Sequence, residues 1–363
     1  MRRVAIAAIV SACALGVAAI IAAGPLNAPA GPVGPTYKTL GEIEPRIAIN
    51  TLAGTGGPTW SYAISQPGSY YLTANLTGEP GKHVLRVGAS NVTIDLNGFA
   101  IDGSAGAIRG IDGNTLEPNN VTVRNGTIRN CTDTAISSDA TVSGWRIEGV
   151  RVSSCGSGIF AARHSVVRDC SVMFCSGTGI SAIWGATVET SVSDENFVGF
   201  SVSFGSTIKG CSAQYNDSYG FNIGAGSTVT ACTARDNADC GFNLADGASI
   251  RGSSASENTT DGIRLGDACV AESNTCVGNG PTVGVAGAGI RAVGDRCRVE
   301  GNALTGNYYA VRADGLNGFF AKNTASGNAF LLQYSISGTN TWGPIVGGTG
   351  ASSNTNPWAN FTH

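Results

Sequence analysis

Carboxylates recur in the middle of this 363-residue sequence, between short apolar runs, and are the side chains best suited to bind a metal. Hard cations such as Ca²⁺ prefer the oxygen atoms of Asp and Glu. If successive turns of the chain stack, carboxylates from neighbouring turns lie close together, so calcium is a candidate cofactor. The simpler alternative is that turns are acidic because they face solvent. The candidate calcium ligands are Asp194, Glu195, Asp217, Asp236, Asp239, Glu257 and Asp261.

Aromatic and arginine side chains near the same turns indicate a second kind of chemistry, the binding of carbohydrate. Tyr and Trp combine an apolar ring, which stacks on a sugar ring, with a polar atom. Arg264 and Arg291 each follow a glycine by two residues, and Arg312 takes the matching place one repeat later. Contact of this row with water is a simpler interpretation than contact with an acidic glycan. The candidate carbohydrate-binding residues are Trp184, Tyr215, Tyr219, Arg235 and Arg264.

The elements that carry these side chains form a repeat of about 21 residues. Three copies run from Phe204 to Leu265, with Ile208, Val229 or Ile250 at the same place in each. Short β-branched runs separated by Gly, Asn, Ser and Asp indicate strands and turns. Each copy is therefore predicted to be one coil of an all-β, single-stranded parallel β-solenoid. The predicted core positions of about eleven coils are Ile94, Val123, Ile147, Val167, Val188, Ile208, Val229, Ile250, Val270, Val299 and Phe320.

Other columns of the repeat are predicted to be structural. Asparagines eight residues after the core position indicate a ladder of stacked amides, in which Asn279 is displaced by one residue. Cysteines at repeating positions favour buried thiols, with Cys269 and Cys297 as the best candidates for a disulfide. The other members of the predicted ladder are Asn196, Asn216, Asn237, Asn258, Asn307 and Asn328. The predicted aromatic stack in the core comprises Phe200, Phe221 and Phe242.

The composition supports this fold and excludes some functions. The 52 glycines, 13% charged residues and 42% hydrophobic residues suit a β-solenoid with a continuous core. A net charge of −3 and a pI near 5.6 provide no basic surface for a nucleic acid. The sequence contains no CxxC pair, so a structural zinc site is not expected.

The chain is predicted to have four parts. A basic start, an apolar run and Ala28-Pro29-Ala30 are typical of a secretory signal peptide, although the run is long enough for an uncleaved membrane anchor. A secreted, periplasmic or cell-surface protein is expected, with membrane contact only through that anchor. Near the end, Trp358 and Phe361 are expected to fold over the last coil. The parts are a signal peptide or anchor (1–30), a linker and N-terminal cap with a first coil (31–90), the β-helix (91–335) and a C-terminal cap or tail (336–363).

Three stretches resemble right-handed parallel β-helix proteins with pectate-lyase-like coils. They are GSYYLTANLTG at 68–78, NVTIDLNGF at 91–99 and NPWANF at 356–361. More narrowly, the chain looks like the secreted β-helix repeat proteins of planctomycete-type bacteria. The resemblance covers nearly the whole chain after the predicted signal peptide. It implies a right-handed solenoid and an extracellular polysaccharide as a candidate partner, and it does not imply one activity.

The sequence leaves three functions open. The first is a non-catalytic β-helix that binds or organises extracellular polysaccharide, the second a polysaccharide lyase, hydrolase or epimerase, and the third a structural or adhesion rod. The motifs typical of polygalacturonases are absent, and His83, His164 and His363 have no partner at motif spacing. Non-catalytic binding is therefore favoured, and neither catalytic residues nor an oligomeric state is assigned.

Overall fold

The computed structural model describes residues 45–52, 56–113, 117–280, 287–329, 333–347 and 354–363. The chain divides into two units, residues 1–45 and residues 46–363. The predicted signal peptide or anchor lies in the first unit, outside the described residues. Within the described residues, no helix is long and apolar enough to span a bilayer.

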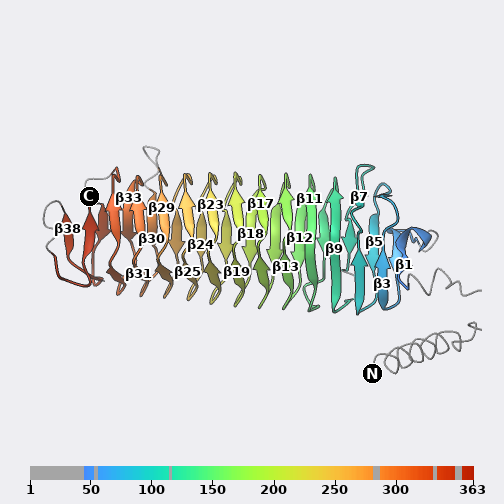
Figure 1. Cartoon of the computed structure of the whole chain (residues 1–363), viewed down its shortest axis with the longest axis horizontal. Helices are drawn as coiled ribbons and strands as arrows, with labels where there is room; N and C mark the ends of the chain where they lie inside the picture. Colours follow the sequence, from blue (N-terminus) through green and yellow to red (C-terminus); the bar gives the residue numbers. More distant parts are fainter. Residues whose placement is uncertain (1–44, 53–55, 114–116, 281–286, 330–332, 348–353) are drawn as a thin grey trace, which may run out of the picture. The chain divides into compact units, whose positions relative to one another are not determined.

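Residues 46–363 form a stack of coils, and the described part is all-β apart from one short 3-10 helix (Figure 1). Coils three and four carry a single long strand in the 26-stranded sheet. Coils one, two and five to twelve place one strand in a 13-stranded sheet and two in the larger one, the last coil places three strands in the larger sheet, and one short strand precedes the first coil. Neighbouring strands pair in parallel. Coil seven, for example, consists of β18 (Val198–Val202), β19 (Thr207–Lys209) and β20 (Ser212–Gln214). The unit is a parallel β-solenoid of thirteen coils, so the predicted fold class is confirmed, with one further coil at each end.

The strands form the 13-stranded sheet and the two faces of the larger sheet. The 13-stranded sheet contains β2 (Trp60–Ile64), β5 (His83–Val87), β8 (Ile111–Asp112), β10 (Thr134–Ser137), β12 (Ser157–Ala161), β15 (Thr178–Ala182), β18, β21 (Phe221–Ile223), β24 (Phe242–Leu244), β27 (Ile263–Leu265), β30 (Ala288–Ala292), β33 (Tyr309–Ala313) and β36 (Tyr334–Ile336). The first face of the larger sheet contains β1 (Ile47–Ala48), β3 (Gly68–Tyr71), β6 (Val92–Asp95), β9 (Val121–Arg129), β11 (Arg146–Ser153), β13 (Val166–Arg168), β16 (Thr187–Glu189), β19, β22 (Thr228–Thr230), β25 (Ser249–Arg251), β28 (Val270–Glu272), β31 (Arg298–Glu300), β34 (Phe319–Ala321) and β37 (Thr341–Trp342). Its second face contains β4 (Leu76–Thr77), β7 (Ala100–Asp102), β14 (Ser171–Met173), β17 (Val192–Asp194), β20, β23 (Thr233–Arg235), β26 (Ser254–Ser256), β29 (Thr275–Val277), β32 (Ala303–Thr305), β35 (Thr324–Ser326), β38 (Ile345–Gly347) and β39 (Asn360–Thr362), and both β9 and β11 extend onto it.

The strand register confirms the predicted core positions with one exception. Ile250 pairs with Ala271, which is fully buried, while Val270 pairs with Ser249 and is half-buried. The prediction of Val270 as a core residue was therefore wrong. Val270 was chosen over the neighbouring alanine because a β-branched side chain is more typical of a strand interior. With Ala271 as the core position, Asn279 follows by eight residues like the other asparagines and is not displaced.

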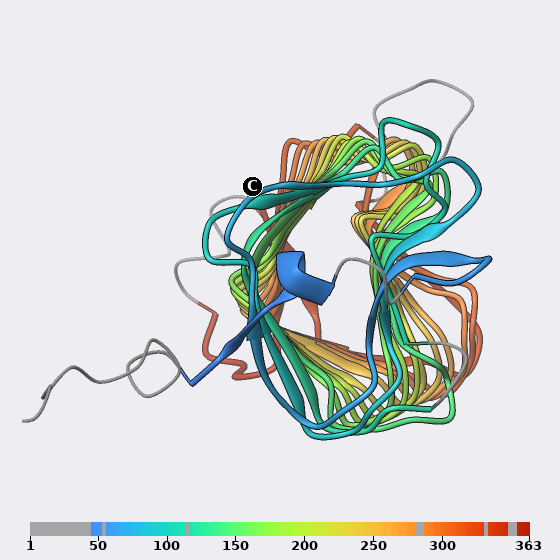
Figure 2. The same cartoon turned by 90° about the vertical axis from the view of Figure 1, so that its right-hand side faces the viewer.

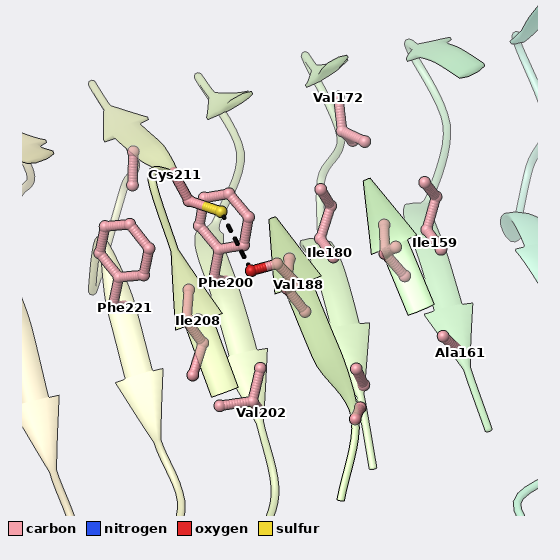
Figure 3. Close-up of a cluster of buried hydrophobic side chains, with 14 of the residues drawn as sticks. Ile159, Ala161, Val172, Ile180, Val188, Phe200, Val202, Ile208, Cys211 and Phe221 are labelled. Carbon is pink, nitrogen blue, oxygen red and sulfur yellow. Dashed lines mark hydrogen bonds between the residues drawn. The ribbon is translucent and has the colours of Figure 1, made fainter. Parts of the chain in front are cut away.

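The core is built from side chains that stack on their equivalents in the next coil. Phe200 and Phe221 have ring centroids 4.7 Å apart and planes 3° apart, and Phe221 and Phe242 have centroids 4.7 Å apart and planes 13° apart. Figure 3 shows Phe200 and Phe221 packed against the side of the core that carries Ile208. This centroid spacing equals the usual distance between paired strands, so the strand register itself stacks the rings. The predicted aromatic stack is confirmed.

The predicted asparagine ladder is confirmed and includes Asn279. Asn258, for example, donates its side-chain N–H to Oδ1 of Asn279 at 2.9 Å, and Asn279 donates to Asn307 at the same distance. A Cβ at Gly241 would lie 2.8 Å from Nδ2 of Asn258. This close approach explains why a glycine directly precedes the buried residue at the start of the strand, as Gly241 precedes Phe242. A second ladder was not predicted, because its column changes from Cys and Ser to Asn along the chain. Its members are Asn274, Asn302, Asn323 and Asn360.

The ten cysteines in the described part of the chain are free and buried. The disulfide predicted between Cys269 and Cys297 is therefore wrong. The thiol of Cys269 lies 3.1 Å from the carbonyl oxygen of Ala245, and that of Cys297 lies 3.0 Å from the carbonyl oxygen of Gly266. The broader prediction, that cysteines at repeating positions act as small buried side chains, is confirmed.

Short segments lie at both ends of the stack. Figure 2 looks along the stack and shows η1 (Ile49–Leu52) in front of the first coils, and Ile49 belongs to the buried core. At the other end Ala359 and Asn360 are buried, whereas Trp358 is 46% exposed and packs edge-on against Phe319. The role of these segments as caps stays a prediction.

Candidate carbohydrate-binding face

The outer surface of the 13-stranded sheet carries one polar residue per coil at the same position over seven coils. These residues immediately follow the buried core residues of their strands, so the alternation of a β-strand turns them outward. All seven are partly exposed. The column extends over six coil steps, or about 30 Å at about 4.8 Å per step. We refer to these seven residues as the polar column, and Ser335 continues their register in the last coil. The members of the column are Ser181, Ser201, Asn222, Asn243, Arg264, Arg291 and Arg312.

A buried carboxylate holds the first two arginines of the column in place. The side chain of Asp261 is 1% exposed and accepts hydrogen bonds from Nε of Arg264 and the backbone N–H of Ala288, both at 2.9 Å. Nη1 of Arg291 lies 3.8 Å from the same carboxylate. Because a buried charge must be compensated, Asp261 fixes the position of both guanidinium groups.

Asp314 joins the second and third arginines. Arg291 donates to it from Nε at 2.8 Å and lies 2.7 Å from it through Nη2, while Nε of Arg312 donates at 2.8 Å. Burial opposes ionisation of Asp314, but the hydrogen bonds from Arg312 and Arg291 outweigh it and lower its pKa. The three arginine side chains remain 25–30% exposed. Each guanidinium has five N–H donors, so donors remain for a ligand.

Tyrosines flank the arginines. Burial, followed by the negative charge of Asp239, raises the pKa of the Tyr219 phenol. The guanidinium of Arg312 lies 5.8 Å from the ring centroid of Tyr309, which contacts Tyr308 edge-on at 5.1 Å. The arginine end of the column is therefore bordered by rings that can stack on a sugar.

The other end of the same face is hollowed. One hollow of about 450 Å³ reaches Ser181 from Arg109 and is lined mainly by Ser and Thr, and a second of about 300 Å³ continues from Ser181 past Asn222. Arg109 is held by Asp112 and Asp133, each at 2.8 Å. The two hollows share Ser181, so they continue the polar column toward the N-terminal coils. Figure 1 labels β12, β18, β24, β30 and β33 of this sheet.

The five predicted carbohydrate-binding residues do not form one site. Tyr219 and Arg264 lie on this face, whereas Tyr215 and Arg235 lie at the corner after the second face of the larger sheet. Trp184 lies at another corner, where the guanidinium of Arg163 is 4.2 Å from the centroid of its ring. The polar column itself, apart from its arginines, was not found from the sequence. Part of its signal was present, because Ser201, Asn222 and Asn243 each directly follow a phenylalanine of the predicted aromatic stack.

The predicted calcium ligands are also dispersed. Arg235 pairs with Asp236 at 3.0 Å and Glu257 at 2.9 Å, and Arg264 lies 3.7 Å from Asp239 in addition to its bond with Asp261. Asp194, Glu195 and Asp217 lie at or near the corner that also carries Tyr215. Among the described residues, no group of three or more His, Cys, Asp or Glu side chains is placed to hold a metal ion. The arrangement does not fit calcium.

Comparison with known proteins defines the class of the fold. The family model for a right handed beta helix region matches residues 162–307. The A-module of the Azotobacter vinelandii mannuronan C-5 epimerase AlgE6 superimposes with a TM-score of 0.60 and 18% identity, covering 86% of this chain and 92% of the module. The A-module of AlgE4 from the same organism also gives 0.60, with 17% identity and coverage of 81% and 93%. No curated protein sequence matches the chain. The chain is a right-handed parallel β-helix, and at these identities the structural likeness shows the fold alone.

Proposed function

We propose that this protein binds a polysaccharide along the polar column without cleaving it. The observation that carries the proposal is the column itself, seven polar side chains in register over about 30 Å, at about 4.8 Å per coil. A small molecule would contact only part of such a row, whereas a linear polymer can follow it. The two A-modules named above belong to enzymes of mannuronan, a polysaccharide, which supports a polymer as the ligand.

The chemistry of the column suits hydroxyl groups. Asn243 donates to Asn222 at 3.0 Å, which leaves further amide donors and acceptors of both side chains for a ligand. At the other end, three arginines stand beside the carboxylates of Asp239, Asp261 and Asp314, so the local charge is balanced. Long-range attraction to a polyanion is therefore weak. Recognition would rely on short-range hydrogen bonds, which arginine can also form with a sugar carboxylate.

The pKa shifts of Asp314 and Tyr219 do not suit general acid–base catalysis at neutral pH. A general acid or base works best when its pKa lies near the working pH. Here the pKa of Asp314 is lowered and that of the Tyr219 phenol is raised, so one stays ionised and the other protonated at neutral pH. Asp261 is engaged by two arginines. Lyase, hydrolase or epimerase activity is the competing function that the experiment below can detect.

The test uses the full chain and a panel of neutral polysaccharides and polyuronates, with retention and polymer length measured together. A matched pair of variants locates the site: Asn222→Ala with Asn243→Ala removes the amide pair, and Thr207→Ala with Thr228→Ala alters exposed residues on the other sheet. We expect the wild type and the threonine control to retain a polymer at unchanged length, and the amide variant to lose about tenfold in affinity, as for one or two hydrogen bonds. A shortened polymer would establish catalysis. Equal retention of the polymer by the amide variant and the threonine control would show that the polar column is not the binding site.

A further inference from the structure

One corner of the solenoid has an unusual choice of residues. Where the second face of the larger sheet turns toward the 13-stranded sheet, ten successive coils from the third to the twelfth place a residue with a φ between 51° and 67°. Such a conformation suits Gly and Asn and is unfavourable for bulky side chains. Phe174 and Tyr215 are the aromatic residues among the ten. The other occupants are Asn130, Ser154, Glu195, Asp236, Glu257, Gly278, Gly306 and Gly327.

Neither aromatic ring gains burial that would offset this conformation. Phe174 is 52% exposed and Tyr215 is 53% exposed, and the nearby Phe197 is 52% exposed. The corner has this backbone conformation in all ten coils, so the feature that packing does not explain is the aromatic side chain, and an unfavourable residue type at such a position points to a function. The rings are therefore placed at the surface for contact with something outside the chain.

The exposed residues alternate between rings and carboxylates. Phe174, Glu195 and Tyr215 occupy the corner position in three successive coils, and Asp217 lies beside Tyr215. Together they line a hollow of about 550 Å³. Phe174 also lines a neighbouring hollow of about 810 Å³, whose other residues are Gly, Ser, Thr, Asn and Cys from the preceding coils. The two hollows lie next to each other along the corner and share Phe174, and we refer to them together as the groove.

The spacing and charge of this groove define a ligand. Phe174 and Tyr215 are two coils apart, or about 10 Å, which is close to the length of a disaccharide unit in an extended glycan. Aromatic rings at that spacing can stack on alternate sugars of one chain. Glu195 and Asp217 form no ion pair within the described part of the chain, so their oxygens are available to sugar hydroxyls. The same two charges repel a polyuronate.

We propose that this corner is a second carbohydrate-binding site, specific for uncharged, hydroxyl-rich glycan chains. Phe174 and Tyr215 provide the stacking platforms, and Glu195 and Asp217 accept hydrogen bonds from the hydroxyl groups between them. The site lies on a different face from the polar column and does not depend on it. The protein could then hold two glycan chains of different chemistry at once.

The test replaces each ring by a residue type that the same corner position already accepts. Phe174→Ser matches Ser154, and Tyr215→Asn matches Asn130, so neither change should disturb the backbone. The control Val277→Ser removes an exposed apolar side chain from the same face three coils away. The full-length variants are titrated calorimetrically with cellohexaose, mannohexaose and chitohexaose, and with an oligouronate of the same length.

We expect at least one neutral hexasaccharide to bind the wild type and the control equally, and the double variant at least tenfold more weakly, with an unchanged melting temperature. Replacing both acids, Glu195→Gln with Asp217→Asn, should raise the affinity of the corner for the oligouronate several-fold. Equal affinity of the double variant and the wild type for every neutral probe would overturn the proposal, as would the absence of neutral binding. A change of oligomeric state in the double variant, with sugar affinity unaltered, would assign the groove to self-association instead. The polar column is tested separately by its own variants, because Asn222→Ala with Asn243→Ala leaves this corner intact.

Discussion

Asn237 donates its side-chain N–H to Oδ1 of Asn258 at 2.9 Å, one coil further along the stack. The same oxygen accepts the backbone N–H of Asn237 at 3.1 Å, so each amide joins its own coil to the next through two bonds. Repeated over successive coils, this relationship fixes the corner of the solenoid and the register of the strands beside it. The faces proposed to bind glycans depend on that register.

Removing one amide of the ladder should destabilise the protein. Asn237→Ala leaves the backbone N–H of Asn216 and the carbonyl oxygen of Ala213 without their partner. Buried groups left unsatisfied cost about 1–3 kcal/mol each, so we expect a loss of about 3 kcal/mol in the free energy of unfolding. Denaturant titration measures this loss. The control Asn243→Ala removes a single bond on the outer face and should cost below about 1 kcal/mol; equal losses would contradict the ladder.

The aromatic stack should be the most sensitive part of the core. Phe221 lies between two rings and is fully buried, so Phe221→Ala should cost about 3–5 kcal/mol. Phe204 is 59% exposed, and Phe204→Ala should change the free energy of unfolding by less than about 0.5 kcal/mol. Urea unfolding of both variants compares the two. A small loss at Phe221 would mean that the coils close over the missing ring.

Loss of the buried carboxylate should loosen the arginine end of the polar column. Asp261→Asn removes the charge that holds Arg264 and Arg291, and hydrogen bonds to charged groups contribute about 1.5–3 kcal/mol, so we expect a loss of that size. Polysaccharide retention should fall with it. The control Glu272→Gln breaks an exposed pair with Arg251 at 3.2 Å and should cost less than about 1 kcal/mol. Unchanged retention in Asp261→Asn would show that the arginines do not contact the ligand.

Stability in acid should reflect Asp102. Burial opposes its ionisation, but bonds from Asn130, the backbone of Ser104 and Arg129 lower its pKa from 3.8 to about 2. A carboxyl with a lowered pKa in the folded state stabilises the protein above its unfolded pKa, and this contribution disappears as the pH falls through the folded value.

The difference in stability between the wild type and Asp102→Asn should therefore be constant above about pH 5 and shrink from pH 3.8 toward about 2. Unfolding by denaturant at stepped pH measures it. A difference that does not depend on pH across this window would show that the bonds to Asp102 do not favour its ionised form.

The fold could be predicted from the sequence, but only part of the candidate site could. The 21-residue period identified the coils, because β-branched core residues recur with little variation. The prediction chose Val270 over Ala271 because valine is the more typical strand residue, although the spacing of Asn279 agrees with Ala271, the residue that the register pairs with Ile250. Tyr215 and Tyr219 are four residues apart in one turn, yet they lie on different surfaces. Grouping residues because they lie in the same turn therefore placed in one predicted site side chains that lie on different surfaces of the solenoid.

The polar column shows why outward positions are harder to predict than core positions. Its residues change from Ser to Asn to Arg, so no single residue type marks the whole column. The row of Arg264, Arg291 and Arg312 was found because the same residue type recurs in three coils. The charge balance around it depends on Asp261 and Asp314, which only the folded structure places beside the arginines.

The dependence of affinity on ligand length tests the central claim most directly. Oligosaccharides of increasing length, taken from the polysaccharide that the protein retains best, are titrated into the full chain and into the Asn222→Ala, Asn243→Ala variant. If a polymer follows the polar column, affinity should rise with each added sugar until the chain spans about 30 Å, then level off, and the variant should lose most of this rise. Affinity that is independent of length beyond a disaccharide, or a rise that the variant retains in full, would contradict binding along the column.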